Sequence, residues 1–142
     1  MKRVAVTGLG VISPVGNDVP TFWNALCSGT CGIGPITKFD ATDYPVKLAA
    51  EVRNFDPKQY MEKLDIMHSD VYTHFAMAAA CQAVADSGIA GTLDAERVGV
   101  YIGSGIGGIA TFMTEHSKLL NRGPRRVSPY FIPMMIPNMG SS

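Results

Sequence analysis

The feature of this sequence that most restricts its fold is a short apolar segment followed by glycines and then a helix, a unit that occurs twice. Residues 3–7 and 97–102 show the nearly continuous apolar pattern of strands that are buried on both faces of a parallel sheet. Glycine-rich turns follow at 8–16 and at 103–108. This alternation predicts an α/β fold with a largely parallel sheet. Because two such strands leave both sheet edges open, we expect the sheet to be incomplete within this chain.

Local start and stop signals predict the helices. Asp18 is a good N-cap for a helix that ends at Gly29, with Pro20 in its first turn. The longest predicted helix carries small residues around most of its circumference, which indicates packing on more than one side. The other expected elements are helices over Asp70–Ser87 (closed by Gly88) and Ile109–Leu120, a short strand over Lys47–Val52, a short helix opening at Asp56-Pro57, and a mostly irregular segment from 121 to 142.

Composition excludes several classes of protein. The chain has 142 residues, of which 46% are hydrophobic and 17% charged, which argues against intrinsic disorder. Twelve basic and twelve acidic side chains cancel, so no global field favours nucleic acid as a partner. Since no apolar run approaches the roughly 18 residues of a spanning helix, we expect no membrane segment and a cytoplasmic protein.

The cysteines and histidines form neither a disulfide framework nor a metal motif. Cys27, Cys31 and Cys81 are odd in number and contain no C-x-x-C, so buried thiols in a reducing compartment are expected. His68 and His74 are six residues apart, which places them on opposite sides of a helix rather than on one face. We therefore interpret them as ordinary surface or core histidines, with no metal site.

The second glycine loop invites comparison with a dinucleotide site. Residues 103–108 read G-x-G-x-x-G, but no following strand carries the acidic residue that would bind a ribose. The first loop departs from the same pattern at Ser13. Close backbone approach is the better explanation of the glycines, and Ile106 would then face an apolar ligand or a packed partner. A dinucleotide-binding protein remains the weaker alternative.

One cluster of charges stands apart from the neutral whole. Lys118, Arg122, Arg125 and Arg126 fall within nine residues, just before the apolar residues 130–132. Such a run is often only a solvated loop. The functional alternative is a docking site for an anionic partner or a phosphate group beside an apolar entrance.

Three motifs in the same order resemble the β-ketoacyl-acyl-carrier-protein synthases, and most closely the synthase II type. They are V-A-V-T-G-L-G-V-I-S-P-V-G at 4–16, I-G-S-G-I-G-G at 102–108 and G-P-R-R-V-S-P-Y-F-I-P at 123–133. The resemblance implies a thiolase-like fold of layered αβαβα type and a homodimeric enzyme without a metal or nucleotide cofactor. Residues 1–139 would be an incomplete N-terminal part of the N-terminal domain, and 140–142 an artificial or truncated tail.

The resemblance also implies a reaction. In this family a cysteine accepts an acyl chain from acyl carrier protein, and two histidines assist the decarboxylation of malonyl carrier protein. The carbanion then attacks the acyl thioester, which is a decarboxylative Claisen condensation of fatty-acid elongation. The nucleophile motif and both histidines lie beyond the matching segment, so no catalytic residue is assigned here and the 142-residue chain alone should be inactive.

The family's binding residues carry over to six positions. Ile106 matches an isoleucine that lines the acyl pocket, while Phe131 and Ile132 match residues that help close the neighbouring pocket near the dimer interface. Arg125 and Arg126 match a basic pair that meets the acidic carrier protein. In the segment 62–69, where the family usually has several basic residues, Lys63 keeps a positive charge, with His68 as a weaker substitute. A non-catalytic synthase-like partner subunit and a polyketide-type ketosynthase remain alternatives.

Overall fold

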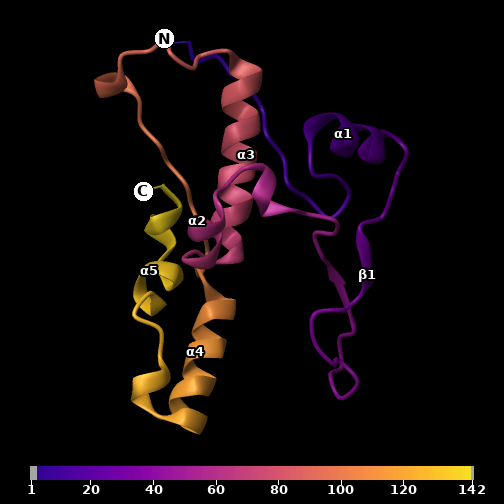
Figure 1. Cartoon of the computed structure of the whole chain (residues 1–142). Coiled ribbons are helices and arrows are strands. Elements are labelled where there is room, and N and C mark those ends of the chain that lie inside the picture. The colour runs from indigo at the N-terminus through magenta and orange to yellow at the C-terminus, as the bar shows by residue number, and fades with distance from the viewer. Residues whose placement is uncertain (1–2, 142) are drawn as a thin grey trace.

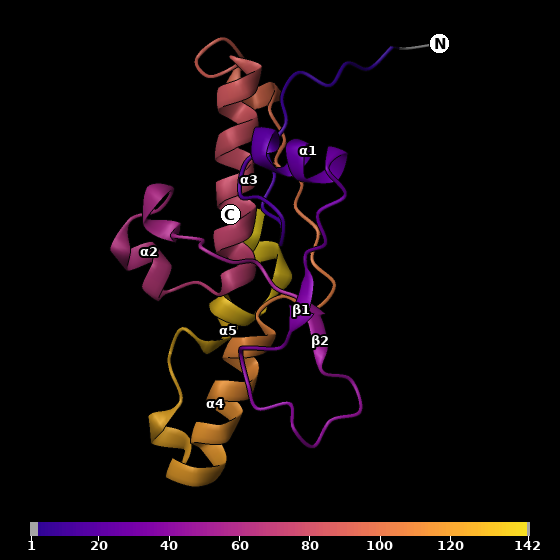
Figure 2. The ribbon, with the colours of Figure 1, turned by 90° about the vertical axis from the view of Figure 1, so that its right-hand side faces the viewer.

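The computed structural model describes residues 3–141. The molecule is elongated: α3 forms its central axis, α4 continues beyond one end of α3, and α1 and a hairpin project to the side (Figures 1 and 2). The elements are α1 (Val19–Cys27), β1 (Ile33–Pro35), β2 (Leu48–Ala50), α2 (Lys63–Met67), α3 (Val71–Ser87), α4 (Ile109–Arg122) and α5 (Phe131–Met135), with 3-10 turns at Pro57–Gln59, Ala95–Arg97, Pro124–Arg126 and Pro137–Ser141.

The predicted helix limits are confirmed where capping is local. Asp18 accepts hydrogen bonds from the Thr21 amide at 2.7 Å and from its hydroxyl at 2.8 Å, which fixes the start of α1. Gly88 adopts a left-handed conformation with φ of 64° and ends α3. The helix expected at 109–120 is also present, and it extends two residues further, to Arg122.

Helix α3 receives the N-terminal segment at very short range. A Cβ atom on Gly8 would overlap the carbonyl oxygen of Ala83, and one on Gly10 would overlap that of Ala79. Polar side chains of α3 hold the same segment, because Leu9 N–H donates to Asp86 at 2.9 Å and Val11 N–H donates to Gln82 at 3.1 Å. The small residues of α3 thus allow a close neighbour on this side of the helix, in line with the prediction that it packs against other parts of the chain.

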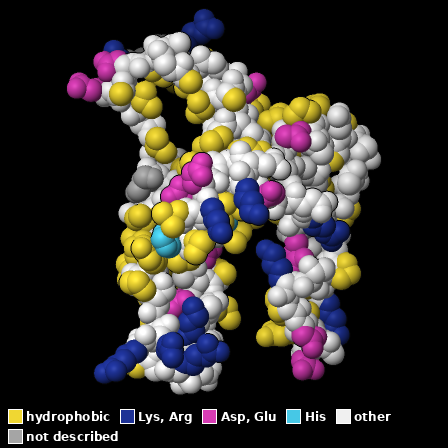
Figure 3. Space-filling view, viewed as in Figure 1, with side chains coloured by type: hydrophobic (Ala, Val, Ile, Leu, Met, Phe, Trp, Pro, Cys, Tyr) yellow, Lys and Arg dark blue, Asp and Glu magenta, His cyan; other side chains and the backbone are white. Residues whose placement is uncertain are grey.

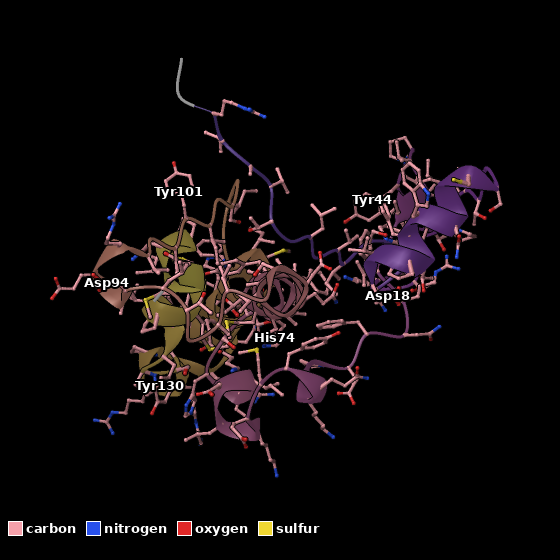
Figure 4. The ribbon with its side chains drawn as sticks, turned by 90° about the horizontal axis from the view of Figure 1, so that it is seen from above. Asp18, Tyr44, His74, Asp94, Tyr101 and Tyr130 are labelled. Atoms are coloured by element: carbon pink, nitrogen blue, oxygen red, sulfur yellow. The ribbon has the colours of Figure 1, made fainter. Side chains whose placement is uncertain are left out.

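The strands predicted at 3–7 and 97–102 are wrong as strands within the described residues. Both segments are extended or turned, and neither belongs to a ladder. Val4 is 95% exposed and Tyr101 is 100% exposed, pointing away from the body of the molecule (Figure 4). The physical reason is that an apolar pattern shows only the tendency to be covered, whereas a strand also needs a neighbour for its N–H and C=O groups.

The sheet found in the described residues is a two-stranded antiparallel hairpin. Its register pairs Ile33 with Ala50 and Pro35 with Leu48. The strand predicted at 47–52 is thus confirmed as β2, while the sequence predicts no strand at the position of its partner β1. Glu51, at the end of β2, accepts from the Thr37 amide at 3.1 Å and its hydroxyl at 2.6 Å.

The C-terminal segment is more ordered than its four prolines suggest. Instead of irregular chain, it forms α5 and two 3-10 turns. Pro133 is the third residue of α5, where its missing N–H breaks no intrahelical bond. Gly140 is buried beside Tyr72, and Ser142 of the predicted tail lies outside the described residues.

Little apolar area is fully covered in the part of the chain that the structure describes. Ala78 on α3 is its one buried hydrophobic residue, while the buried polar residues are Glu51, Asp70, Thr73, His74 and Glu115. Within residues 3–141, no helix has both the length and the apolar character needed to cross a membrane. The high hydrophobic content therefore lies mainly at partly open surfaces.

The close packing on α3 gives a direct test. Replacing Gly10 with Ala should destabilise the protein by about 1–3 kcal/mol, because the new methyl group pushes the N-terminal backbone away from the Ala79 carbonyl. Gly99→Ala is the matched control, since nothing lies within 4 Å of its added Cβ. Urea unfolding measures both variants, and equal midpoints for the two would contradict the close approach.

Candidate functional site

The second half of the glycine loop is a packed joint and not a phosphate cradle. A Cβ atom on Gly107 would overlap the Met135 carbonyl oxygen, and one on Gly108 would overlap that of Met134. Two of the loop amides are used internally: Gly107 N–H donates to Ser104 Oγ at 2.9 Å, and Gly108 N–H donates to Met135 O at 2.9 Å. Because these two N–H groups are already hydrogen-bonded, they are not available to a pyrophosphate, which counts against the dinucleotide alternative.

An apolar pocket of about 260 Å³ lies beside this joint. Ile106 forms part of its wall and is 67% exposed. The other lining residues come from the start of α4 and from the end of α5 and the residues after it: Gly108, Ile109, Phe112, Met135, Ile136 and Pro137. The pocket is thus built where the joint brings the two helices together.

The three residues expected at the acyl pocket are only partly brought together. Phe131 does not line the pocket but contacts Phe112 of its wall, with ring centroids 6.2 Å apart. Ile132 is also absent from the lining and is exposed. Ile106 and Phe131 therefore belong to one apolar region, whereas Ile132 presents its side chain elsewhere.

Arg125 and Arg126 lie in the 3-10 turn that follows α4, and both are exposed. Gly123, with φ of 81°, separates this turn from the helix, and its N–H donates to Leu119 O at 3.1 Å. Lys and Arg side chains gather at the end of the molecule where α4 stops (Figure 3). The predicted basic cluster therefore lies at the surface. Its 3-10 turn, Pro124–Arg126, is here called the basic turn.

A buried carboxylate supports the basic turn. Glu115 of α4 is only 5% exposed, accepts from Lys118 Nζ at 2.5 Å and accepts from the Ser128 amide at 2.7 Å. Two hydrogen bonds hold the pKa of Glu115 below its usual value. The one from Lys118 has the larger effect, and the one from the Ser128 amide has the second largest. Lys118 and Glu115 form the single ion pair among residues 3–141. The charge of Lys118 is therefore partly neutralised, whereas the arginines of the basic turn form no ion pair there.

Lys63, the remaining predicted carrier contact, is the exposed first residue of α2. The far end of α2 reaches the segment before α5, because the His68 ring stacks on Tyr130 with centroids 3.8 Å apart. Sequence reasoning missed this contact, since no local pattern joins residues 62 positions apart. The stack connects the helix that carries Lys63 with the loop that follows the basic turn.

The thiols and histidines make no catalytic pair in the described structure. Cys27, Cys31 and Cys81 are free but exposed, so the expectation of buried thiols is wrong. His74 is buried, and its Nε2 lies 3.1 Å from Ser69 Oγ and 3.3 Å from Ile66 O, which is the structural role of an ordinary core histidine. No group of three or more His, Cys, Asp or Glu in residues 3–141 could hold a metal ion.

Comparison with known proteins settles which family these features belong to. Residues 1–142 match the family model described as "Beta-ketoacyl synthase, N-terminal domain". The chain belongs to the β-ketoacyl synthase family. The resemblance seen in the three motifs is thereby confirmed.

Relatives agree along nearly the whole chain. The "3-oxoacyl-[acyl-carrier-protein] synthase 2" of Coxiella burnetii (strain RSA 493 / Nine Mile phase I) is 50% identical over 141 residues, which are 99% of this chain and 34% of that protein. The chain thus spans about a third of the length of the curated relatives it matches.

Solved structures of this family have the same fold. A crystal structure of a β-ketoacyl synthase from Burkholderia phymatum STM815 matches with a TM-score of 0.81 at 24% identity, over 99% of this chain and 35% of that one. A type II polyketide ketosynthase, AntDE, in complex with its acyl-carrier protein AntF matches with a TM-score of 0.78 at 25% identity, over 96% of this chain and 37% of that one. The expected thiolase-like fold is confirmed.

Because its pKa is lowered in the folded protein, Glu115 should make stability depend on pH. Its contribution is fully present above the pKa of the unfolded chain and is lost as the pH falls through the folded pKa. The wild type should therefore lose its stability advantage over Glu115→Gln between roughly pH 5 and pH 3. Urea unfolding of both proteins across this range checks the sign, and an advantage that grows on acidification would contradict it.

Proposed function

We propose that this chain is the N-terminal part of a 3-oxoacyl-[acyl-carrier-protein] synthase of type II, acting in the cytoplasm as a homodimer in fatty-acid elongation. The observation that carries the proposal is the 50% identity with the Coxiella burnetii synthase over 141 residues. Residues 1–139 would belong to the N-terminal domain, and the joint at 107–108 would set the position of the acyl-binding surface.

The chain's own residues would bind and orient the substrates. Arg125 and Arg126 present two permanent positive charges on one exposed turn, which suits an acidic acyl carrier protein. Lys63 would add a third contact from α2. Ile106 would contact the acyl chain, with Phe131 supporting the pocket wall through Phe112 and Ile132 facing the second subunit.

The bond-forming step would be supplied by the family's cysteine and two histidines. The cysteine thiolate attacks the carrier thioester, and the carrier thiol leaves as the acyl group moves to the enzyme. Malonyl carrier protein then loses CO₂, and its carbanion attacks the acyl-enzyme carbonyl and expels the cysteine. The polyketide-type alternative is less favoured, because identity falls from 50% with the fatty-acid synthase to 25% with the polyketide enzyme.

The 142-residue chain should not be acylated when it is incubated with acyl carrier protein loaded with a fatty acyl group. None of its three exposed thiols hydrogen-bonds to a histidine in the described structure, so none has the base that activates a nucleophile. Intact-protein mass spectrometry gives the answer. A stable acyl adduct on Cys27, Cys31 or Cys81 would contradict this assignment.

In the full-length synthase that carries this chain, Arg125→Ala with Arg126→Ala should raise KM for the carrier-linked substrate roughly tenfold, because two charge contacts are lost. Activity on short acyl thioesters without carrier should be unchanged. Lys38→Ala with Lys47→Ala removes the same charge from the connection between β1 and β2 and is the matched control. Equal losses on both kinds of substrate, or equal effects of both double variants, would count against docking.

A further inference from the structure

Glu115 is an unexpected residue beneath a surface that is proposed to bind an acidic partner. Its negative charge neutralises Lys118 and lowers the positive potential next to Arg122, Arg125 and Arg126. It is also nearly buried, and an ionised carboxylate is stable there only when it is paired and hydrogen-bonded. A purely electrostatic docking surface would be better without it, so its contribution must come from geometry.

That geometry starts from the hydrogen bond between Glu115 and the Ser128 amide, at 2.7 Å. Ser128 is two residues after the basic turn, so this bond ties the C-terminal side of the turn back to α4. The other side is tied by Gly123 N–H, which donates to Leu119 O at 3.1 Å. Between these two anchors, Arg126 N–H donates to Gly123 O at 3.1 Å. The arginines therefore stand on a short loop fixed at both ends to one helix.

Ser128 also orders the start of α5. Its hydroxyl accepts from the Tyr130 amide at 3.1 Å, and its carbonyl accepts from the Phe131 amide at 3.1 Å, which begins that helix. One carboxylate on α4 thus fixes the residue from which the basic turn extends in one direction and α5 in the other. The charge-assisted bonds to Glu115 are the strong kind, because its lowered pKa keeps the carboxylate ionised at neutral pH.

We infer that Glu115 is a positioning residue for carrier-protein binding: through the Ser128 amide it holds Arg125 and Arg126 in the arrangement that meets the carrier. The inference rests on the proposed function and goes beyond it, because it assigns the affinity of the basic turn partly to a residue that never touches the partner. A turn that is ordered in advance loses less conformational entropy when the partner binds.

The test is steady-state kinetics of the full-length synthase with Glu115→Ala. KM for the carrier-linked substrate should rise roughly fivefold, which corresponds to about 1 kcal/mol, while kcat and activity on carrier-free acyl thioesters stay unchanged. Glu115→Gln keeps an acceptor for the Ser128 amide and should rescue most of the loss. A merely structural role would instead lower activity on both substrates in proportion to the folded fraction.

Lys118→Met is the matched control for the ion pair. It leaves the bond from the Ser128 amide to Glu115 in place, so it should change KM less than Glu115→Ala does. Removal of Glu115 also frees Lys118 to meet an acidic partner directly. A fall in KM on Glu115→Ala would therefore show that the freed charge outweighs the geometry and would overturn the inference.

A double-mutant cycle separates this inference from the proposed function. In the Arg125→Ala, Arg126→Ala background, Glu115→Ala should have no further effect on KM, because it acts through those arginines. If the arginine variant raises KM but the Glu115 effect is absent or simply multiplies with it, the positioning role is wrong and docking stands. If the arginine variant leaves KM unchanged, the docking proposal itself fails.

Discussion

The structure depends on how closely backbone can approach helix α3. Gly8 and Gly10 lie against the carbonyl oxygens of Ala83 and Ala79, at a separation that leaves no room for a Cβ atom on either glycine. The same helix holds other segments through polar side chains: Gln82 Nε2 donates to Asn17 O at 2.8 Å, and Tyr72 Oη donates to Ile136 O at 2.6 Å. Without the small residues of α3, the N-terminal segment could not pack this closely against the helix.

A second close approach determines how the start of α4 meets the end of α5. Asp70, just before α3, does not cap its own helix but accepts from the Thr111 amide at 2.9 Å and its hydroxyl at 2.5 Å, so it caps α4 instead. Gly107 and Gly108 then bring the start of α4 against the end of α5. The apolar pocket at Ile106 and the basic turn lie at opposite ends of α4, and their relative position follows from this one helix.

The sequence was sufficient for features whose cause is local. Asp18, Gly29 and Gly88 mark helix ends because capping involves atoms only a few residues apart. It was insufficient for 3–7 and 97–102, because an apolar pattern does not say whether a partner strand is present, and none pairs with them in the described residues. Glu115 had no signal at all, because a lone glutamate in a polar helix looks like any solvated residue until Ser128 is placed beside it. The family motifs pointed to Ile106 and to the arginine pair, whereas the structure leaves Phe131 and Ile132 out of the pocket lining.

The two unpaired extended segments also have a consequence for the order of assembly. A ribosome releases residues 3–7 first and residues 97–102 several seconds later, at a synthesis rate of about 5–20 residues per second. Val4 and Tyr101 remain almost fully open even after α3 and α4 have formed, so helix formation alone does not protect them. While these extended segments stay uncovered, they can pair with another extended chain. Both segments therefore stay accessible to other chains even though the helices around them are complete.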